Sequence, residues 1–331
     1  EGKGTKGKLL ELVQDMVATY PLSFTDLWLE PDDTDEGVTV MRSEESHASL
    51  RVFDRKDSNG NSLPYYEYRD TAMSRTAPYK PEWIKVLRFV EGEDPDNPDV
   101  AFNNGHLLHQ LTFFIGEVNF YWISGGKKFC QTLNTGDSCY ITPFIPHSFT
   151  SRDRDRPGLI IAVTFASSVR RALRSLSQLP PEMMEAASGD LRDPTSAFAA
   201  KLKRYRDSES LSISELSVLI QSEGVKPMRA SLVAAANTLP TDLELQALAK
   251  ALGAKEKDLE VRGMNPNEDV AIRHKSATPQ RLYPDSNKPA CNLTPLARTK
   301  FQPGLRGFNV EFLGSDVAGA VFEHCLHEYA Y

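Results

Sequence analysis

Two linked stretches, FNNGHLLHQLTFFIGEVNFYW (102–122) and LNTGDSCYITPFIPHSF (133–149), decide the fold of this chain. Apolar and polar or aromatic residues alternate from Leu111 to Ile115, which predicts a strand, and Gly116-Glu117 predicts the turn into a second strand at 118–122. Gly136-Asp137 predicts a further turn, and the apolar run 140–145 predicts a short strand with His147 at its far end. The whole stretch is therefore expected to fold as consecutive strands.

Three of the seven histidines lie in these stretches: His106, His109 and His147. Residues four apart on a strand share a face, so His106 and Gln110 should point the same way and His109 the other way. Two imidazoles and one side-chain oxygen from separate strands form a metal site with open positions. We therefore predict metal ligation by His106, Gln110 and His147, and a packed, non-ligating His109. The alternative is a metal-free fold with two hydrogen-bonded histidines and a solvated Gln110.

These motifs also carry a family resemblance. The spacing G-x6-P-x2-P-H (136–147) resembles the second motif of the cupin barrel, and N-N-G-H (103–106) with H-x3-Q resembles the non-haem iron enzymes of phosphonate metabolism. That family includes hydroxyethylphosphonate dioxygenase, hydroxypropylphosphonate epoxidase and methylphosphonate synthase. The resemblance implies an α+β fold built on a cupin (double-stranded β-helix or jelly-roll) barrel, an Fe(II) cofactor and a non-haem iron oxygenase-type enzyme.

The third ligand separates the members of this family. The epoxidase has H-x3-E where this chain has Gln110, and the dioxygenase has its carboxylate six residues before the second His, where this chain has Ile141. Gln after the first His and Ile before the second is the pattern of the methylphosphonate synthases. The resemblance thus implies Fe(II)- and O2-dependent C–C cleavage of 2-hydroxyethylphosphonate to methylphosphonate and carbon dioxide or bicarbonate. The alternative is the dioxygenase outcome, hydroxymethylphosphonate and formate.

Substrate-binding residues also follow from the resemblance. A phosphonate dianion requires cationic and hydroxyl donors. If DSNGN (57–61) is partly an insertion, Arg55 and Tyr68 match the family's Arg and Tyr, and Asn103 matches its Asn three residues before His106. The alternatives are a surface charge for Arg55 and a strand aromatic for Tyr68. The family's serine falls near Ala162, its lysine from a helical module has no identifiable counterpart, and no separate catalytic group is predicted.

Helical spacing of apolar residues up to Pro21, and again across 198–261, predicts helices on both sides of the strand-rich region. Ser212 and Glu215 resemble a capping box, and the order of the helices resembles a helix-turn-helix module. A shift of 232 residues aligns 13–40 with 245–272, which predicts an internal repeat. We expect four segments: a remnant of an N-terminal helical module (1–36), a metal-binding cupin (37–168), a helix-turn-helix-like module (169–264) and a partial, metal-free second cupin (265–331).

The second cupin contains its own histidine motif. HCLHE (324–328) repeats the H-x3-Q spacing with a carboxylate, so His324 and Glu328 resemble the first two ligands. We interpret them as a decayed copy of the metal site, because the second barrel of this family is usually metal-free.

Composition limits the remaining possibilities. The chain has 331 residues, is 40% hydrophobic and 25% charged, and carries a net charge of −7, which argues against a general nucleic-acid partner. The four cysteines lack CxxC spacing, no apolar run approaches the ~20 residues of a membrane span, and the polar start at Glu1–Lys8 is unlike a signal peptide. We therefore expect a cytoplasmic protein with no membrane partner. Separately, we expect a homo-oligomer.

A transcription regulator is the competing interpretation, because a helix-turn-helix module joined to a cupin is also the build of small-molecule-sensing regulators. A DNA-binding surface requires an excess of basic residues. Residues 201–262 contain ten Lys or Arg and nine Asp or Glu, so this module is nearly neutral. We rank the regulator below the enzyme.

Overall fold

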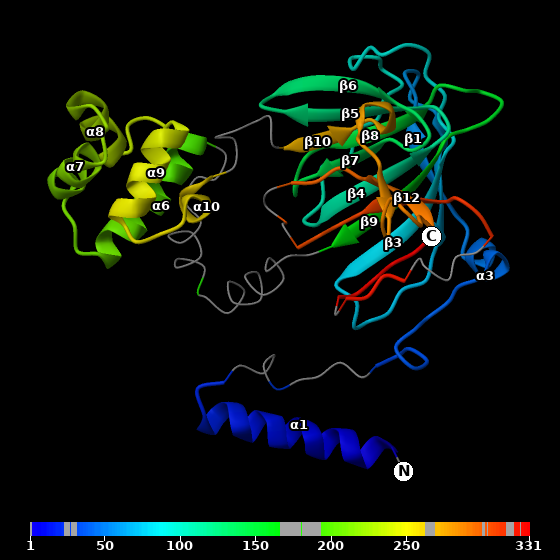
Figure 1. Cartoon of the computed structure of the whole chain (residues 1–331), viewed down its shortest axis with the longest axis horizontal. Helices are drawn as coiled ribbons and strands as arrows, with labels where there is room; N and C mark the ends of the chain where they lie inside the picture. The colour runs from blue at the N-terminus through cyan, green and yellow to red at the C-terminus, as the bar shows by residue number, and fades with distance from the viewer. Residues whose placement is uncertain are drawn as a thin grey trace.

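The computed structural model describes residues 2–22, 27, 32–165, 180, 193–261, 269–299, 302, 304–315, 321–324 and 326–331, with side chains from Gly7 onward. The described chain combines α-helices with antiparallel sheets, so the predicted mixed fold is confirmed. Figure 1 shows the strands gathered together, with helices α6–α10 to one side of them.

Seven strands form the largest sheet, and each neighbouring pair in it is antiparallel. In spatial order they are β1 (Arg51–Lys56), β2 (Ser62–Asp70), β3 (Tyr79–Val86), β9 (Leu159–Phe165), β4 (His109–Ile115), β7 (Ser138–Ile141) and β10 (Val270–Arg273). A second sheet has the order β6 (Lys127–Leu133), β5 (Val118–Ser124) and β8 (His147–Ser151), and a third has the order β11 (Arg281–Tyr283), β12 (Cys291–Pro295) and β13 (Phe308–Phe312).

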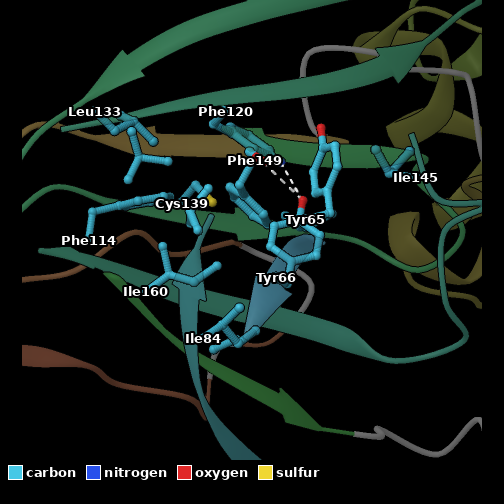
Figure 2. Close-up of a cluster of buried hydrophobic side chains, with 14 residues drawn as sticks. Tyr65, Tyr66, Ile84, Phe114, Phe120, Leu133, Cys139, Ile145, Phe149 and Ile160 are labelled. Atoms are coloured by element: carbon cyan, nitrogen blue, oxygen red, sulfur yellow. Dashed lines mark hydrogen bonds between the residues drawn. The ribbon is translucent and has the colours of Figure 1, made fainter. Parts of the chain in front are cut away.

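One hydrophobic core joins the seven-stranded sheet to the β6-β5-β8 sheet. Its buried residues alternate along strands of both sheets, as strand geometry requires, and include Tyr66, Ile84, Phe114, Cys139, Ile160, Phe120, Leu133 and Phe149. Figure 2 shows these side chains interleaved between the strands. The Tyr66 hydroxyl donates to the Phe149 carbonyl (3.1 Å) and accepts from the Phe149 N–H (2.8 Å), which fastens β2 to β8.

This arrangement is consistent with the cupin barrel that the sequence predicts. The strand ladders of the described residues leave the two sheets separate, and the isolated Phe89–Ser151 bridge links β8 only to the chain that follows β3, so a fully closed barrel is not seen. The internal repeat remains a prediction.

The prediction of a strand at 140–145 is wrong for the second half of that range. Strand β7 ends at Ile141, and the chain then turns through Pro143 and Phe144, whose φ is +61°. Two prolines within four residues interrupt the supply of ladder N–H groups, which is why the strand cannot continue. His147 consequently begins the new strand β8 instead of ending the previous one.

The helices are α1 (Gly2–Thr19), α3 (Ser43–Ala48), α6 (Pro194–Ser208), α7 (Ile213–Ser222), α8 (Pro227–Ala234), α9 (Asp242–Ala251) and α10 (Glu256–Leu259), with a 3₁₀ turn at Lys275–Ala277. Helices α6–α10 share a separate core that includes Phe198, Leu216 and Leu248. The predicted capping box is confirmed: Ser212 Oγ accepts from the Glu215 N–H (3.2 Å), and Glu215 accepts from the Ser212 N–H (2.8 Å). The sequence also predicts helices at 169–176 and 181–187, and both stretches lie outside the described residues.

The segment after the helices returns to the strands. Strand β10 pairs with β7 and so extends the first sheet, while β11–β13 form their own sheet. The division into four segments stays a prediction. No helix of the described chain is long and apolar enough to cross a bilayer.

Candidate functional site

The three predicted ligands come together at one end of the strands. His106 lies just before β4, Gln110 is the second residue of β4, and His147 is the first residue of β8. The His106 Nε2 atom is 3.0 Å from Gln110 Oε1, and the centroids of the His106 and His147 rings are 5.1 Å apart. The predicted shared direction of His106 and Gln110 is therefore seen, although His106 belongs to the turn before the strand.

Gly105 explains why the motif before His106 requires a glycine. Its φ is +73°, and a Cβ atom there would be 2.5 Å from the carbonyl carbon of Phe144. This close approach lets the Phe144 N–H donate to the His106 carbonyl at 2.8 Å. The turn carrying His106 is thereby fixed against the turn that leads into His147.

Backbone carbonyls set the tautomers of both histidines. His106 Nδ1 is 2.6 Å from the Leu108 carbonyl, and His147 Nδ1 is 2.8 Å from the Ile145 carbonyl. A carbonyl only accepts, so each Nδ1 carries the proton and each Nε2 presents a lone pair. Burial lowers the pKa of His147 to about 4, which keeps that ring neutral at physiological pH.

This donor set fits a cation. In the neutral tautomer that the Leu108 carbonyl favours, His106 Nε2 and Gln110 Oε1 are both acceptors, and they lie 3.0 Å apart. Two lone pairs so close repel unless a positive charge lies near both. A backbone carbonyl bonded to the far nitrogen of each imidazole is the usual support for a metal-binding histidine. Two imidazole nitrogens and one oxygen leave positions open, as Fe(II) sites that bind O2 and substrate require.

Asn103 is oriented toward the same group. Its Oδ1 accepts from the backbone N–H groups of Gly105 and His147, each at 2.9 Å. Both amide hydrogens of Asn103 are therefore free to point the other way, and Nδ2 lies 3.1 Å from His147 Nε2. The side chain thus directs an N–H donor at the Nε2 lone pair of His147.

A cavity of about 540 Å³ opens on the face of the seven-stranded sheet and contains both other predicted substrate residues, Arg55 and Tyr68. Its remaining lining residues are Arg51, Phe53, Tyr66, Asp70, Lys80 and Glu82. Arg51 pairs with Asp70 and Lys80 with Glu82, each at 2.8 Å. The Arg55 guanidinium has no carboxylate partner among the ion pairs of the described residues, so it is available to an anion.

The cavity shares a sheet face with Gln110. Lys80 on β3, Thr164 on β9 and Gln110 on β4 are directly opposite one another in consecutive strands. Opposite residues of antiparallel strands point to the same side, and two strand spacings amount to about 10 Å. Arg55 and Tyr68 make no hydrogen bond to the three candidate ligands in the described structure, so a ligand would have to bridge the two groups.

Tyr68 is a hydroxyl donor at neutral pH. Burial raises its pKa to about 12, the negative charge of Glu82 adds to this, and Arg55 opposes it. The protonated phenol can therefore donate to an anionic oxygen.

Sequence reasoning missed Lys80 and Glu82. The available signal was their spacing, because two charged residues at i and i+2 lie on one face of the strand 79–86. Lys80 also lies in one cross-strand row with Thr164 and Gln110.

The other histidines lie elsewhere. His109 Nδ1 is 2.8 Å from the Tyr140 hydroxyl, and its ring stacks on Phe165, away from His106, as predicted. His324 Nε2 is 3.1 Å from Glu328 in a partly exposed pair. No group of three His, Cys, Asp or Glu side chains with metal-binding geometry occurs among the described residues.

Comparison with known proteins places this geometry in a family. No family model matches the chain. Methylphosphonate synthase of Nitrosopumilus maritimus (strain SCM1) is 36% identical over 328 residues, which cover 97% of this chain and 68% of that protein. The (S)-2-hydroxypropylphosphonic acid epoxidase of Streptomyces wedmorensis is 30% identical over 136 residues, 40% of this chain and 62% of that protein.

A solved structure extends the comparison. Streptomyces albus HEPD with 2-hydroxyethylphosphonate and Fe(II) bound superposes with a TM-score of 0.68 and 37% identity, covering 91% of this chain and 66% of that one. The chain spans about two thirds of the length of these two longer relatives. It belongs to the non-haem iron enzyme family that contains methylphosphonate synthase, hydroxyethylphosphonate dioxygenase and hydroxypropylphosphonate epoxidase.

Proposed function

We propose that this protein cleaves the C–C bond of 2-hydroxyethylphosphonate with O2 and Fe(II), giving methylphosphonate and carbon dioxide or bicarbonate. The observation that supports the proposal is the proximity of His106, Gln110 and His147 in a member of this enzyme family: His106 Nε2 lies 3.0 Å from Gln110 Oε1, and the two imidazole rings are 5.1 Å apart. The relative from Nitrosopumilus is a methylphosphonate synthase, and the Streptomyces albus structure contains both 2-hydroxyethylphosphonate and Fe(II).

The reaction balances without an added reductant. One 2-hydroxyethylphosphonate and one O2 give one methylphosphonate, one carbon dioxide and one water, so all four electrons come from the substrate. Bound Fe(II) would supply the O2 chemistry, with His106, Gln110 and His147 as its ligands.

The protein's own groups would bind and orient the substrate. Arg55 provides for the phosphonate a charge that no carboxylate of the described residues pairs with, and Tyr68 provides a protonated hydroxyl beside it. The Asn103 amide, held by two backbone N–H groups, offers a further donor beside His147. These donors would hold the phosphonate end of the substrate and so orient its hydroxyl-bearing carbon toward the three ligands.

The dioxygenase outcome is the alternative, because the chain is 37% identical to the Streptomyces albus HEPD and 36% identical to the Nitrosopumilus synthase. Sequence identity therefore does not indicate which of the two products this protein forms. The synthase is favoured because Gln110 and Ile141 stand where the other members carry carboxylates, and Ile141 cannot ligate iron or exchange a proton.

The helix-turn-helix-like module is proposed to be structural, and the cytoplasmic location and homo-oligomeric state expected from the sequence remain predictions. The module's nearly balanced charge supports a role other than DNA binding.

The decisive experiment loads the protein anaerobically with Fe(II) and 2-hydroxyethylphosphonate, admits O2 and identifies products by phosphorus NMR. Methylphosphonate is the expected product. His147→Ala should abolish Fe(II) binding and turnover, whereas His109→Ala, a buried histidine outside the site, should retain Fe(II) binding. Full activity of His147→Ala would overturn the assignment.

A further inference from the structure

The neutral ligand Gln110 raises an orientation problem that a carboxylate does not have. A carboxylate presents an oxygen on either side, but an amide presents an oxygen on one side and an NH₂ group on the other. Only the oxygen can coordinate a metal. A half-turn of the Gln110 amide would therefore remove the ligand without moving the rest of the side chain.

The unwanted orientation has a favourable hydrogen bond of its own. The Leu108 carbonyl holds the proton of His106 on Nδ1, so His106 Nε2 is an acceptor. A rotated Gln110 would donate its NH₂ group to that nitrogen at about the observed 3.0 Å separation. Some other group must outweigh this bond for the oxygen to face His106.

Thr112 makes the opposing contact. The Gln110 Nε2 atom donates to Thr112 Oγ1 at 2.8 Å, between two buried side chains two residues apart on the same face of β4. Rotation of the amide would turn its oxygen toward this hydroxyl, and the present bond would be lost.

Cys139 helps Thr112 to act as an acceptor. A threonine hydroxyl can also donate, so it selects one amide orientation only if its proton is engaged elsewhere. Cys139 is directly opposite Thr112 in the β4–β7 ladder and is fully buried, so its sulfur is a neighbour of the Thr112 side chain on the same face of the sheet. If the hydroxyl proton points to this sulfur, the Thr112 lone pairs remain for Gln110.

We propose that Thr112 is a positioning residue that holds the Gln110 amide with its oxygen toward the metal and its NH₂ group away from His106. This inference rests on the proposed Fe(II) site. It assigns Thr112 no contact with substrate, and it gives the buried Cys139 thiol a supporting role.

The test measures Fe(II) affinity by anaerobic competition with a chelator, together with the absorption spectrum of the Co(II)-loaded protein. Thr112→Val, which keeps the shape and removes the acceptor, should weaken affinity about 10-fold, a typical loss when a group supporting a metal ligand is removed, and should change the Co(II) spectrum. Thr112→Ser, which keeps the hydroxyl, should behave as the unmodified protein.

Thr150→Val is the matched control. Thr150 is equally buried, and its hydroxyl is 3.2 Å from that of Tyr121, away from Gln110. Thermal unfolding should respond similarly to both valine substitutions, while metal affinity and the Co(II) spectrum should respond only to Thr112→Val. Equal losses of affinity in both would mean that Thr112 is merely structural.

Gln110→Glu sharpens the test. Because a carboxylate has an oxygen on either side, adding Thr112→Val to Gln110→Glu should cost much less affinity, within about 3-fold. Should Thr112→Val fail to fold, Thr112→Ala serves in its place with the same expected results.

The outcomes separate two failures. If the unmodified protein does not bind Fe(II), the proposed function fails and this inference fails with it. If the unmodified protein binds Fe(II) and Thr112→Val binds it equally with an unchanged Co(II) spectrum, only the role of Thr112 is overturned.

Discussion

Ile141 on β7 is the residue directly opposite Gln110 on β4, and its side chain is completely buried. Opposite residues of an antiparallel pair have neighbouring side chains on one face of the sheet. The position where the family resemblance implies a carboxylate ligand in the dioxygenases is therefore a branched hydrocarbon in contact range of the candidate oxygen ligand. This relationship connects the ligand set to the choice of product.

Substitution of Ile141 by Glu should change that choice. The carboxylate would lie beside the metal site, where a cation offsets the cost of burying its charge. We expect hydroxymethylphosphonate and formate to increase at the expense of methylphosphonate, measured by phosphorus and proton NMR. Ile141→Leu keeps the site apolar and should leave the product ratio unchanged. An unaltered ratio in Ile141→Glu with Fe(II) still bound would show that this position does not control the product.

Removal of the Arg55 charge should weaken substrate binding. A hydrogen bond to a charged group contributes about 1.5–3 kcal/mol, so Arg55→Ala should raise KM about 10- to 100-fold. The KM of Arg55→Lys should lie between those of the unmodified protein and Arg55→Ala. Arg156→Ala is the control, because the Arg156 side chain is 89% exposed and outside the cavity. KM is measured by steady-state kinetics with 2-hydroxyethylphosphonate. An unchanged KM in Arg55→Ala would show that the phosphonate binds elsewhere.

The strand alternation, the helical spacing and the two histidine motifs were sufficient to predict the strands, the helices and the meeting of His106 with Gln110. Local spacing determines those features. The cavity was only partly predicted, since Arg55 and Tyr68 came from family resemblance while Lys80 and Glu82 were missed. Which strand lies beside which is a non-local property, and it is the order β2-β3-β9-β4 that puts Lys80 in a row with Gln110.

The start of β8 at His147 was also missed, for a different reason. The apolar run 140–145 has the composition of one strand, but Pro143 and the positive φ of Phe144 divide it. Composition alone cannot reveal that a non-glycine residue adopts a left-handed conformation there, because the neighbouring turn at Gly105 stabilises it through the Phe144–His106 hydrogen bond.

The helical module should not bind DNA. Arg229 of α8 forms a two-point ion pair with Glu244 of α9 (2.7 and 2.6 Å), so one of the ten basic side chains in residues 201–262 is already neutralised. Mobility-shift measurements with duplex DNA should show no sequence-selective binding at submicromolar protein. A salt-sensitive, selective shift would instead support the regulator.

The same ion pair should make the stability of the module depend on pH. The Arg229 guanidinium lowers the pKa of Glu244 from 4.5 to about 2. A carboxyl group with a lowered pKa in the folded state stabilises above its unfolded-state pKa, so the contribution, about 2 to 3 kcal/mol, is present above pH 4.5 and lost as pH falls toward 2. Denaturant unfolding followed by helical circular dichroism should show this loss in the unmodified protein.

Two substitutions isolate the Glu244 contribution. Glu244→Gln should be less stable at pH 7, and its free energy of unfolding should change less between pH 4.5 and 2. Glu256→Gln removes an exposed carboxyl group and should show the same pH dependence of unfolding as the unmodified protein. If Glu244→Gln retains the full pH dependence, another group is responsible.

Isotope transfer gives the strictest test of the proposed product. After C–C cleavage, a one-carbon phosphonate fragment and a formate-level fragment share the site. If the formate-level fragment stays bound and gives its hydrogen to the phosphonate fragment, methylphosphonate forms and carbon dioxide leaves. If hydroxyl transfer to the phosphonate carbon comes first, hydroxymethylphosphonate and formate form.

An apolar Ile141 beside Gln110 offers no polar group to assist hydroxyl transfer, so hydrogen transfer should prevail. With deuterium on the hydroxyl-bearing carbon of 2-hydroxyethylphosphonate, one deuterium should appear in the methyl group by carbon and phosphorus NMR. Deuterated formate accumulating with unlabelled hydroxymethylphosphonate would assign the chain to the dioxygenases instead.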